Sequence, residues 1–197
     1  MNTKFRPCAA AAALTVMSIA VEAAPVTYTI DADHSKPVFE IRHMGLSTYR
    51  GRFDTISGSV TLDTAAKKGS ADVAIAVASV STGVAKLDEH LKTADFFDAS
   101  TYPTITFKST DFKFKGDQLV SISGDLGMHG VSKPVTLTVD HFACREHPFY
   151  KVPACGGDAH TVIKRLDWGG IGQKYPADIL GADVTLRIPI EARAPKP

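Results

Sequence analysis

The chain has few cysteines, and none stands in a metal-binding pattern. Of its 197 residues three are cysteine, and only Cys144 and Cys155 lie beyond the first two dozen positions. There is no C-x-x-C pair, and the seven histidines include no H-x-x-x-H pair, so the usual zinc patterns are missing. Two cysteines in an exported protein favour a disulfide. The alternative is a metal site that both cysteines share with His141 and His147.

Signatures of catalysis and of phosphate binding are also missing. No G-x-S-x-G elbow is present to expose a nucleophile. Asp31, His34 and Ser35 are close in sequence, but a catalytic triad is defined by geometry. The segment "GGIG" (169–172) does not lead from a strand into a helix, so it is no phosphate loop. We therefore expect no enzyme, no catalytic residue, no metal and no cofactor.

The longest apolar run is too short to cross a membrane. It spans residues 8–21 without a charged residue, which is fewer than the roughly 20 residues that a transmembrane helix needs. Two basic residues precede it, and a Val-Glu-Ala step that ends at Ala23 follows it. This arrangement predicts a cleaved signal peptide over 1–23. Residues 24–197 suffice for one domain, which we expect in the periplasm.

The processed chain would carry no net charge. Residues 1–23 hold two basic residues and one acidic residue of a chain whose formal net charge is +1. A neutral chain lacks the basic field that collects nucleic acid or an anionic membrane surface, so neither is expected as a partner. The pair Lys67-Lys68 is interpreted as part of a solvated turn. The sequence is compatible with a homodimer.

Beyond residue 25, apolar and polar residues alternate with a period of two. This alternation predicts strands with one buried face, separated by turn signals. The predicted strands are 26–33, 38–44, 56–63, 72–80, 104–109, 120–128, 135–139, 159–168 and 182–192. Short strands joined by tight turns pair antiparallel, and hiding the sheet edges requires a sandwich or a barrel. The regular order of hairpins favours an all-β, eight-stranded antiparallel barrel.

One stretch, about 84–94, has helical spacing, with Leu87 and Leu91 on one face. We expect this short helix near the barrel mouth. Phe96 and Phe97 follow it, and neighbours on a helix point about 100° apart, so both rings cannot join the same face. One ring is expected to plug the barrel end and the other to line an entrance.

Composition alone leaves the barrel interior open to two interpretations. The inward faces are almost wholly apolar, and an eight-stranded barrel is wide enough to be filled by side chains or to hold one small ligand. Small residues in or beside the strands, such as Gly124 and Ala76, indicate that bulk is missing. A filled barrel and an apolar cavity are equally supported at this point.

Four segments, taken together and in order, resemble one family. They are "YTIDADHSKPVFEIRHMG" (28–45), "LDEHLKTADFFDASTYPTITFKS" (87–109), "GDLGMHGVSKPVTLTV" (124–139) and "IKRLDWG" (163–169). They are similar to the YceI-like proteins, exported lipocalin-like barrels described as polyisoprenoid-binding. The resemblance implies a lipocalin-like barrel that holds one long isoprenoid chain, of an isoprenoid quinone or a polyprenyl phosphate. Trp168 departs from it, standing where phenylalanine is expected.

The expected ligand contacts lie on the inward faces and near the helix. The apolar candidates are Phe39, Ile41, Val73, Ile75, Leu87, Leu91, Phe96, Phe97, Ile105, Phe107, Leu126, Met128 and Trp168. His43, His90 and Arg165 are the polar candidates, because each could contact a quinone carbonyl or a phosphate oxygen. The alternatives are histidines satisfied by neighbouring backbone, and an Arg165 paired with an aspartate such as Asp88 or Asp95.

The sequence and the resemblance together predict a periplasmic binding or carrier protein. Its expected partner is a long-chain isoprenoid lipid, held as a ligand in an apolar barrel cavity. Two alternatives stay open: an exported, stress-related structural protein with a filled barrel, and an enzyme that acts on a hydrophobic substrate.

Overall fold

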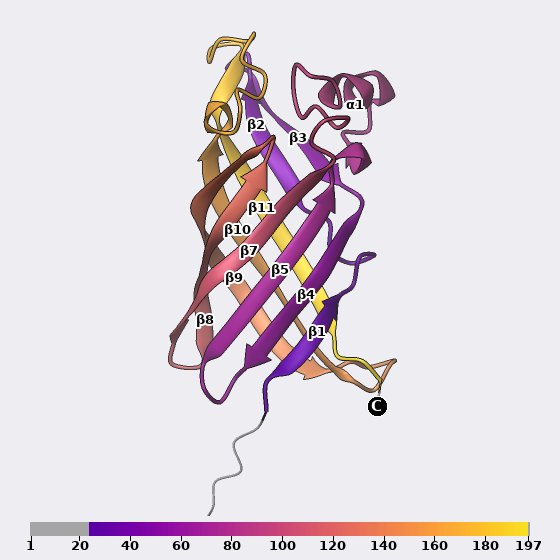
Figure 1. The fold of residues 1–197 in the computed structure, drawn as a ribbon, viewed down its shortest axis with the longest axis vertical. Helices are drawn as coiled ribbons and strands as arrows, with labels where there is room; N and C mark the ends of the chain where they lie inside the picture. Colours follow the sequence, from indigo (N-terminus) through magenta and orange to yellow (C-terminus); the bar gives the residue numbers. More distant parts are fainter. Residues whose placement is uncertain (1–23, 197) are drawn as a thin grey trace, which may run out of the picture.

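The described chain forms one closed ring of antiparallel strands (Figure 1). The computed structural model describes residues 24–196, so the predicted signal peptide, 1–23, lies outside the described residues. The strands are β1 (Val26–Ile30), β2 (Val38–His43), β3 (Ser47–Phe53), β4 (Ile56–Asp63), β5 (Lys68–Ala76), β6 (Val80–Ser81), β7 (Thr104–Lys115), β8 (Gln118–Met128), β9 (Val131–Glu146), β10 (Pro153–Lys164) and β11 (Leu180–Arg193). The helix is α1 (Ala85–Leu91), and the short 3-10 turns are η1 (Val77–Ser79) and η2 (Arg165–Asp167).

Eight strand positions make up the ring, and two strands in line fill each of the first three. β1 and β2 both lie along β11, as the pairs Ile30 with Ala192 and Val38 with Arg187 show. β3 and β4 form the second position and β5 and β6 the third. Consecutive positions are neighbours, and β1 closes on β11. The predicted eight-stranded antiparallel barrel is therefore confirmed.

The sequence does not predict β3, because a glycine interrupts its apolar alternation. Gly51 is buried, and a Cβ atom built there would lie 2.2 Å from Cζ of Phe39. The ring of Phe39, which comes from the neighbouring strand β2, thus fills the space that a side chain at this position would take. The position of Gly51 in a strand is thus explained by its contact with Phe39 on the neighbouring strand and not by a local apolar pattern.

Ser35 bridges the gap between β1 and β2. Its side chain is fully buried, and its hydroxyl lies 3.0 Å from the amide N of Glu191 and 3.3 Å from the carbonyl O of Glu191, in β11. The hydroxyl accepts from the first and donates to the second, so it continues the ladder where β1 ends. Beside it, the buried Asp31 pairs with His34 at 3.0 Å and with Arg193 at 3.1 Å. These three polar residues of the first motif close the barrel wall.

The barrel has two unlike ends (Figure 1). The helix end, at the top, carries α1 and the long connections 82–103 and 165–179. The terminal end, at the bottom, carries the short turns after β4, β7 and β9 and the outer ends of β1 and β11. The predicted helix is present at the first of these ends, although it is shorter than 84–94. Within 24–196 no helix has the length and apolar character needed to cross a bilayer.

Candidate ligand-binding cavity

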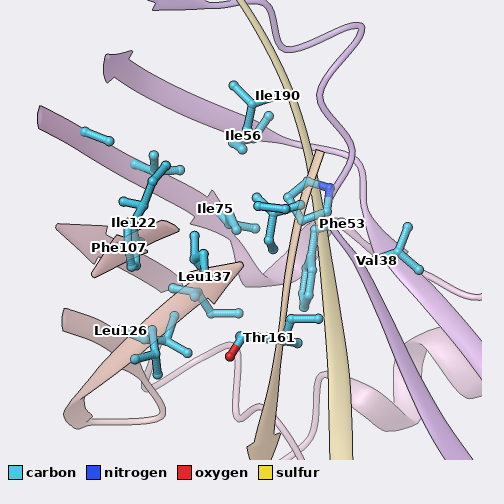
Figure 2. Close-up of a pocket in the computed structure, with 18 of the residues that line it drawn as sticks. Val38, Phe53, Ile56, Ile75, Phe107, Ile122, Leu126, Leu137, Thr161 and Ile190 are labelled. Atoms are coloured by element: carbon cyan, nitrogen blue, oxygen red, sulfur yellow. The ribbon is translucent and has the colours of Figure 1, made fainter. Parts of the chain in front are cut away.

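An apolar cavity of about 240 Å³ lies inside the barrel. Its wall runs from Phe96 and Phe97 at the helix end to Tyr28 and Ala192 at the terminal end. Figure 2 shows side chains from several strands, Ile75 and Leu126 among them, that point into this interior. One water molecule needs only roughly 10–15 Å³, and cavities with an apolar lining stay dry. The interior is therefore not filled by its own side chains.

Most of the predicted contact residues lie on the cavity wall. They are Phe39, Ile41, Val73, Ile75, Leu91, Phe96, Phe97, Ile105, Phe107, Leu126, Met128 and Arg165. The period-two pattern therefore identified the inward faces of four strands, and the helical spacing identified Leu91. Contact between these residues and a ligand stays a prediction.

The two predicted histidines lie outside the cavity wall. His43 is half-buried and packs at 6.4 Å, edge to face, against the ring of Tyr49. The ring of His90 lies 4.9 Å from that of Phe96, and its Nε2 atom is 4.0 Å from the carboxylate of Asp95. Both contacts anchor the surface of the helix end, so neither imidazole is placed to meet a ligand inside the barrel.

Leu87 and Trp168 also do not line the cavity. Leu87 packs against the core of the helix end. Trp168 is only 3% exposed, and its indole N–H donates to the carbonyl of Leu126 at 3.1 Å. An indole can make this bond and the phenylalanine expected from the resemblance cannot, so Trp168 contributes a buried hydrogen bond at this position.

Arg165 lines the cavity, but backbone carbonyls use all of its donors. Its five N–H groups donate to the carbonyl oxygens of Ile171, Gly172, Tyr175, Leu180 and Gly181, at 2.6 to 3.0 Å. Burial lowers the pKa of this guanidinium. The predicted pairing with Asp88 or Asp95 is wrong, because Asp88 accepts from Thr82 and Asp95 pairs with Lys174. The side chain organises the connection 165–179 and keeps no N–H free for a ligand.

Phe96 and Phe97 both reach the cavity. Phe96 stacks on Tyr175 with ring centroids 5.6 Å apart. Phe97 meets Phe53 edge to face at 5.5 Å and Phe39 at 6.0 Å. The two rings thus point to different partners, as expected, and both lie on the wall at the helix end; their division into a plug and a doorway stays a prediction.

The small residues that suggested missing bulk do not create the cavity. Neither Gly124 nor Ala76 lies on its wall. A Cβ atom at Gly124 would lie 2.5 Å from Cζ of Phe107, so that ring already covers the glycine. Gly156 and Gly157 of β10 do line the cavity, near the terminal end. The interior is hollow, but the cavity comes from the way the inward side chains of opposite walls meet and not from the small residues that the sequence indicated.

The sequence missed the part of the wall that lies at the terminal end. Its members include Tyr28, Leu62, Phe112, Leu119, Phe142 and Ala192. The register of β7 against β8 shifts between Ser109 and Asp111, so Phe107 and Phe112 both face inward although they differ in parity. A β-bulge of this kind breaks the period on which the prediction depends. Aromatic residues on either side of a break in alternation are the signal that could have found them.

The predicted disulfide is confirmed. Cys144 and Cys155 face each other across β9 and β10 at the terminal end and are bonded. Both thiols are consumed, so the alternative metal site with His141 and His147 is wrong. Among residues 24–196, no three histidine, cysteine or acidic side chains gather in a way that could hold a metal ion.

Comparison with known proteins gives both a family and a fold. Residues 28–192 match the family model described as the YceI-like domain. A UPF0312 protein of Pseudomonas aeruginosa is 37% identical over 153 residues, which cover 75% of this chain and 78% of the relative. The crystal structure of Burkholderia cenocepacia BcnA has a TM-score of 0.71 at 26% identity and covers 83% of this chain and 99% of its own. A polyisoprenoid-binding domain from Saccharophagus degradans shares the fold, with a TM-score of 0.66 at 20% identity over 86% of this chain and 99% of its own.

Proposed function

Since the chain belongs to the YceI-like family, we propose that it is a periplasmic binding protein that carries a long isoprenoid lipid in its barrel. The observation that carries this proposal is the apolar cavity that reaches from one end of the barrel to the other. The polyisoprenoid-binding domain from Saccharophagus degradans, which has the same fold, supports the choice of ligand. Binding without catalysis agrees with a wall that is made almost wholly of hydrocarbon.

The cavity wall suits a branched hydrocarbon tail. Burying apolar surface contributes about 25 cal/mol per Å², or about 0.8 kcal/mol per CH₂ group. Several isoprene units within the barrel would therefore bind tightly without one charged contact. The rings of Phe39, Phe97 and Phe107 add broad apolar faces to this wall.

The wall also bears on the head group. Arg165 is the one cationic side chain among the described wall residues, and backbone carbonyls already occupy its five N–H groups. A phosphate drawn inside would lack a partner, and an unpaired buried charge costs several kcal/mol. We therefore propose an uncharged head group, as in an isoprenoid quinone, in preference to a polyprenyl phosphate held within the barrel.

Extraction of the purified protein with organic solvent, followed by mass spectrometry, tests the proposal. We expect a long-chain isoprenoid, recovered chemically unchanged. Thr161 points into the cavity (Figure 2), and its neighbour Val162 is exposed on the outer face of the same strand. Thr161→Phe should therefore exclude most of the lipid, and Val162→Phe should leave the lipid content unchanged.

Two results would overturn the proposal. One is a protein that is empty when purified and takes up no isoprenoid quinone during incubation. The other is a lipid content that Thr161→Phe leaves as high as that of the Val162→Phe control, with both variants folded by circular dichroism. If an isoprenyl phosphate binds as tightly as the matching quinone, the assignment of an uncharged head group fails, while the carrier function stands.

A further inference from the structure

The barrel separates its charges along its axis, although its net charge is close to zero. Outside the connection between β1 and β2, the residues at the terminal end, 63–68, 115–118, 145–153 and 193–196, include seven basic and three acidic side chains, and one of these basic residues, Arg193, pairs with Asp31 of that connection. The corresponding residues at the helix end, 43–47, 82–103, 128–131 and 165–179, include four basic and six acidic ones. The zero net charge from which the sequence predicts no basic field does not reveal this separation, because a net charge carries no information about position.

The same end exposes an aromatic tip at the turn between β9 and β10. Phe149 is 85% exposed and Tyr150 is 48% exposed. The turn is fixed by backbone hydrogen bonds between His147 and Val152 at 2.8 Å and between Lys151 and His147 at 2.9 Å. Just behind it the disulfide joins the two strands. A phenylalanine is thus held out in water by a braced hairpin, and burial of its ring against a surface would be favourable.

Four cations lie around this tip, and two of them are paired, Lys151 with Glu146 at 3.5 Å and Arg193 with Asp31 at 3.1 Å. The guanidinium of Arg193 lies 4.3 Å from the centre of the Tyr150 ring, and the ammonium of Lys196 lies 6.0 Å from it. Lys151 and Arg145 flank the aromatic pair in the hairpin itself. Aromatic side chains favour the depth of lipid head groups, and lysine and arginine favour anionic lipids.

We propose that the terminal end docks on the surface of an anionic lipid bilayer. Phe149 and Tyr150 enter the head-group layer, and Arg145, Lys151 and Lys196 lie against the lipid phosphates. The helix end is the natural comparison, because it exposes Leu46 at 82%, nearly as much as Phe149, and also exposes Met44, Val84, Leu166 and Ile179. Its excess of acidic side chains repels an anionic surface, so exposure alone does not choose the docking end. This inference concerns the outside of the barrel and does not depend on what the cavity holds.

Sedimentation with vesicles tests the proposal. The purified protein is mixed with vesicles of equal parts phosphatidylglycerol and phosphatidylcholine, or of phosphatidylcholine alone, at about 0.05 M and about 0.5 M salt, where screening differs strongly. We expect binding to the anionic vesicles at low salt, weakened at high salt, and little binding to the neutral vesicles. Phe149→Ser should weaken binding at least about tenfold through lost apolar burial. Leu46→Ser, its matched control at the other end, should leave binding unchanged.

Charge variants give an independent measure. Arg145→Gln and Lys196→Gln should each weaken binding about fivefold at low salt, whereas Lys86→Gln at the helix end should have no effect. The proposal is overturned if anionic vesicles bind no protein, if neutral vesicles bind equally, or if Leu46→Ser weakens binding and Phe149→Ser does not. Binding to a soluble polyanion such as heparin that matches vesicle binding and is insensitive to Phe149→Ser would point to an acidic macromolecule and would also overturn it.

Discussion

The two ends of the barrel are stabilised by different chemistry. The helix end carries long, irregular connections, and there buried side chains satisfy the backbone: Arg165 binds five carbonyls and Trp168 a sixth. The terminal end carries short turns that satisfy their own backbone groups, and a covalent bond between Cys144 and Cys155 holds it. Buried backbone groups need partners. The comparison therefore teaches that the irregular connection 165–179 depends on polar side chains from the interior, whereas the short turn between β9 and β10 does not.

Removal of the guanidinium at the helix end should have the largest effect. Arg165→Met leaves several carbonyl oxygens of the connection 165–179 without donors, so we expect a loss of about 3 kcal/mol or more in the free energy of unfolding. Lys164→Met is the control, because Lys164 is exposed and pairs only with Asp183 at the surface. Urea denaturation of both variants gives the measurement. Equal losses in the two would contradict a special role for the buried arginine.

Opening the disulfide should have the next largest effect. The bond closes a loop with a sequence separation of 11 residues, for which chain entropy predicts about 2–3 kcal/mol. We expect the double variant Cys144→Ala, Cys155→Ala to lose about this much stability by urea denaturation, and the reduced wild type to behave similarly. Full stability after reduction would show that the terminal end does not depend on its covalent link.

The indole of Trp168 should contribute less than the guanidinium. Trp168→Phe removes the buried hydrogen bond that the indole N–H donates to the carbonyl of Leu126, so we expect a loss of about 1–2 kcal/mol. The same denaturation experiment measures it. A phenylalanine variant as stable as the wild type would mean that ring packing alone, without the hydrogen bond, holds this position.

The smallest effect should be a pH dependence near the terminal end. The hydrogen bond to Asp31 raises the pKa of the His34 imidazole, so this pair stabilises the fold fully below about pH 6.5 and less as the pH rises through the raised pKa. Burial alone would raise the pKa of Asp31, but its bonds to His34, to the Asp33 amide and to Arg193 together lower it, so stability falls as the pH drops below about 4.

Thermal denaturation at pH values below about 4, between about 4 and 6.5, and above about 6.5 measures the effects of both Asp31 and His34 on stability. We expect the wild type to have its highest melting temperature between about pH 4 and pH 6.5. The decline on the alkaline side should be slight, because His34 is mostly exposed, and His34→Asn should remove it. A variant that keeps the same alkaline decline would locate its cause at another residue.

The sequence predicted regular parts of the structure and failed where contacts between distant residues decide. Alternation identified the inward faces that carry Phe39, Ile75 and Leu126, because each strand shows its own period. It could not identify β3, whose Gly51 makes sense only beside the ring of Phe39. In the same way, the sequence around Arg165 does not indicate that its hydrogen-bond partners are backbone carbonyls up to 16 residues further along the chain.

The cavity itself was only half predictable. Apolar inward faces are compatible with a filled and with a hollow interior, because the volume depends on how side chains from opposite walls meet. Gly124 indicated missing bulk in the sequence, yet the ring of Phe107 covers it. The position of Phe112 on the wall depends on a register shift that the local pattern does not show.

The ring closes along a single seam, where β1 and β2 meet β11. All other pairings join strand positions that follow one another in the chain, so they can form while synthesis proceeds. The seam can form only after β11, the last strand, has been synthesised. A chain that stops before Leu180 would therefore be an open, twisted sheet with two unpaired edges, which would favour aggregation. Enclosure of the cavity requires β11.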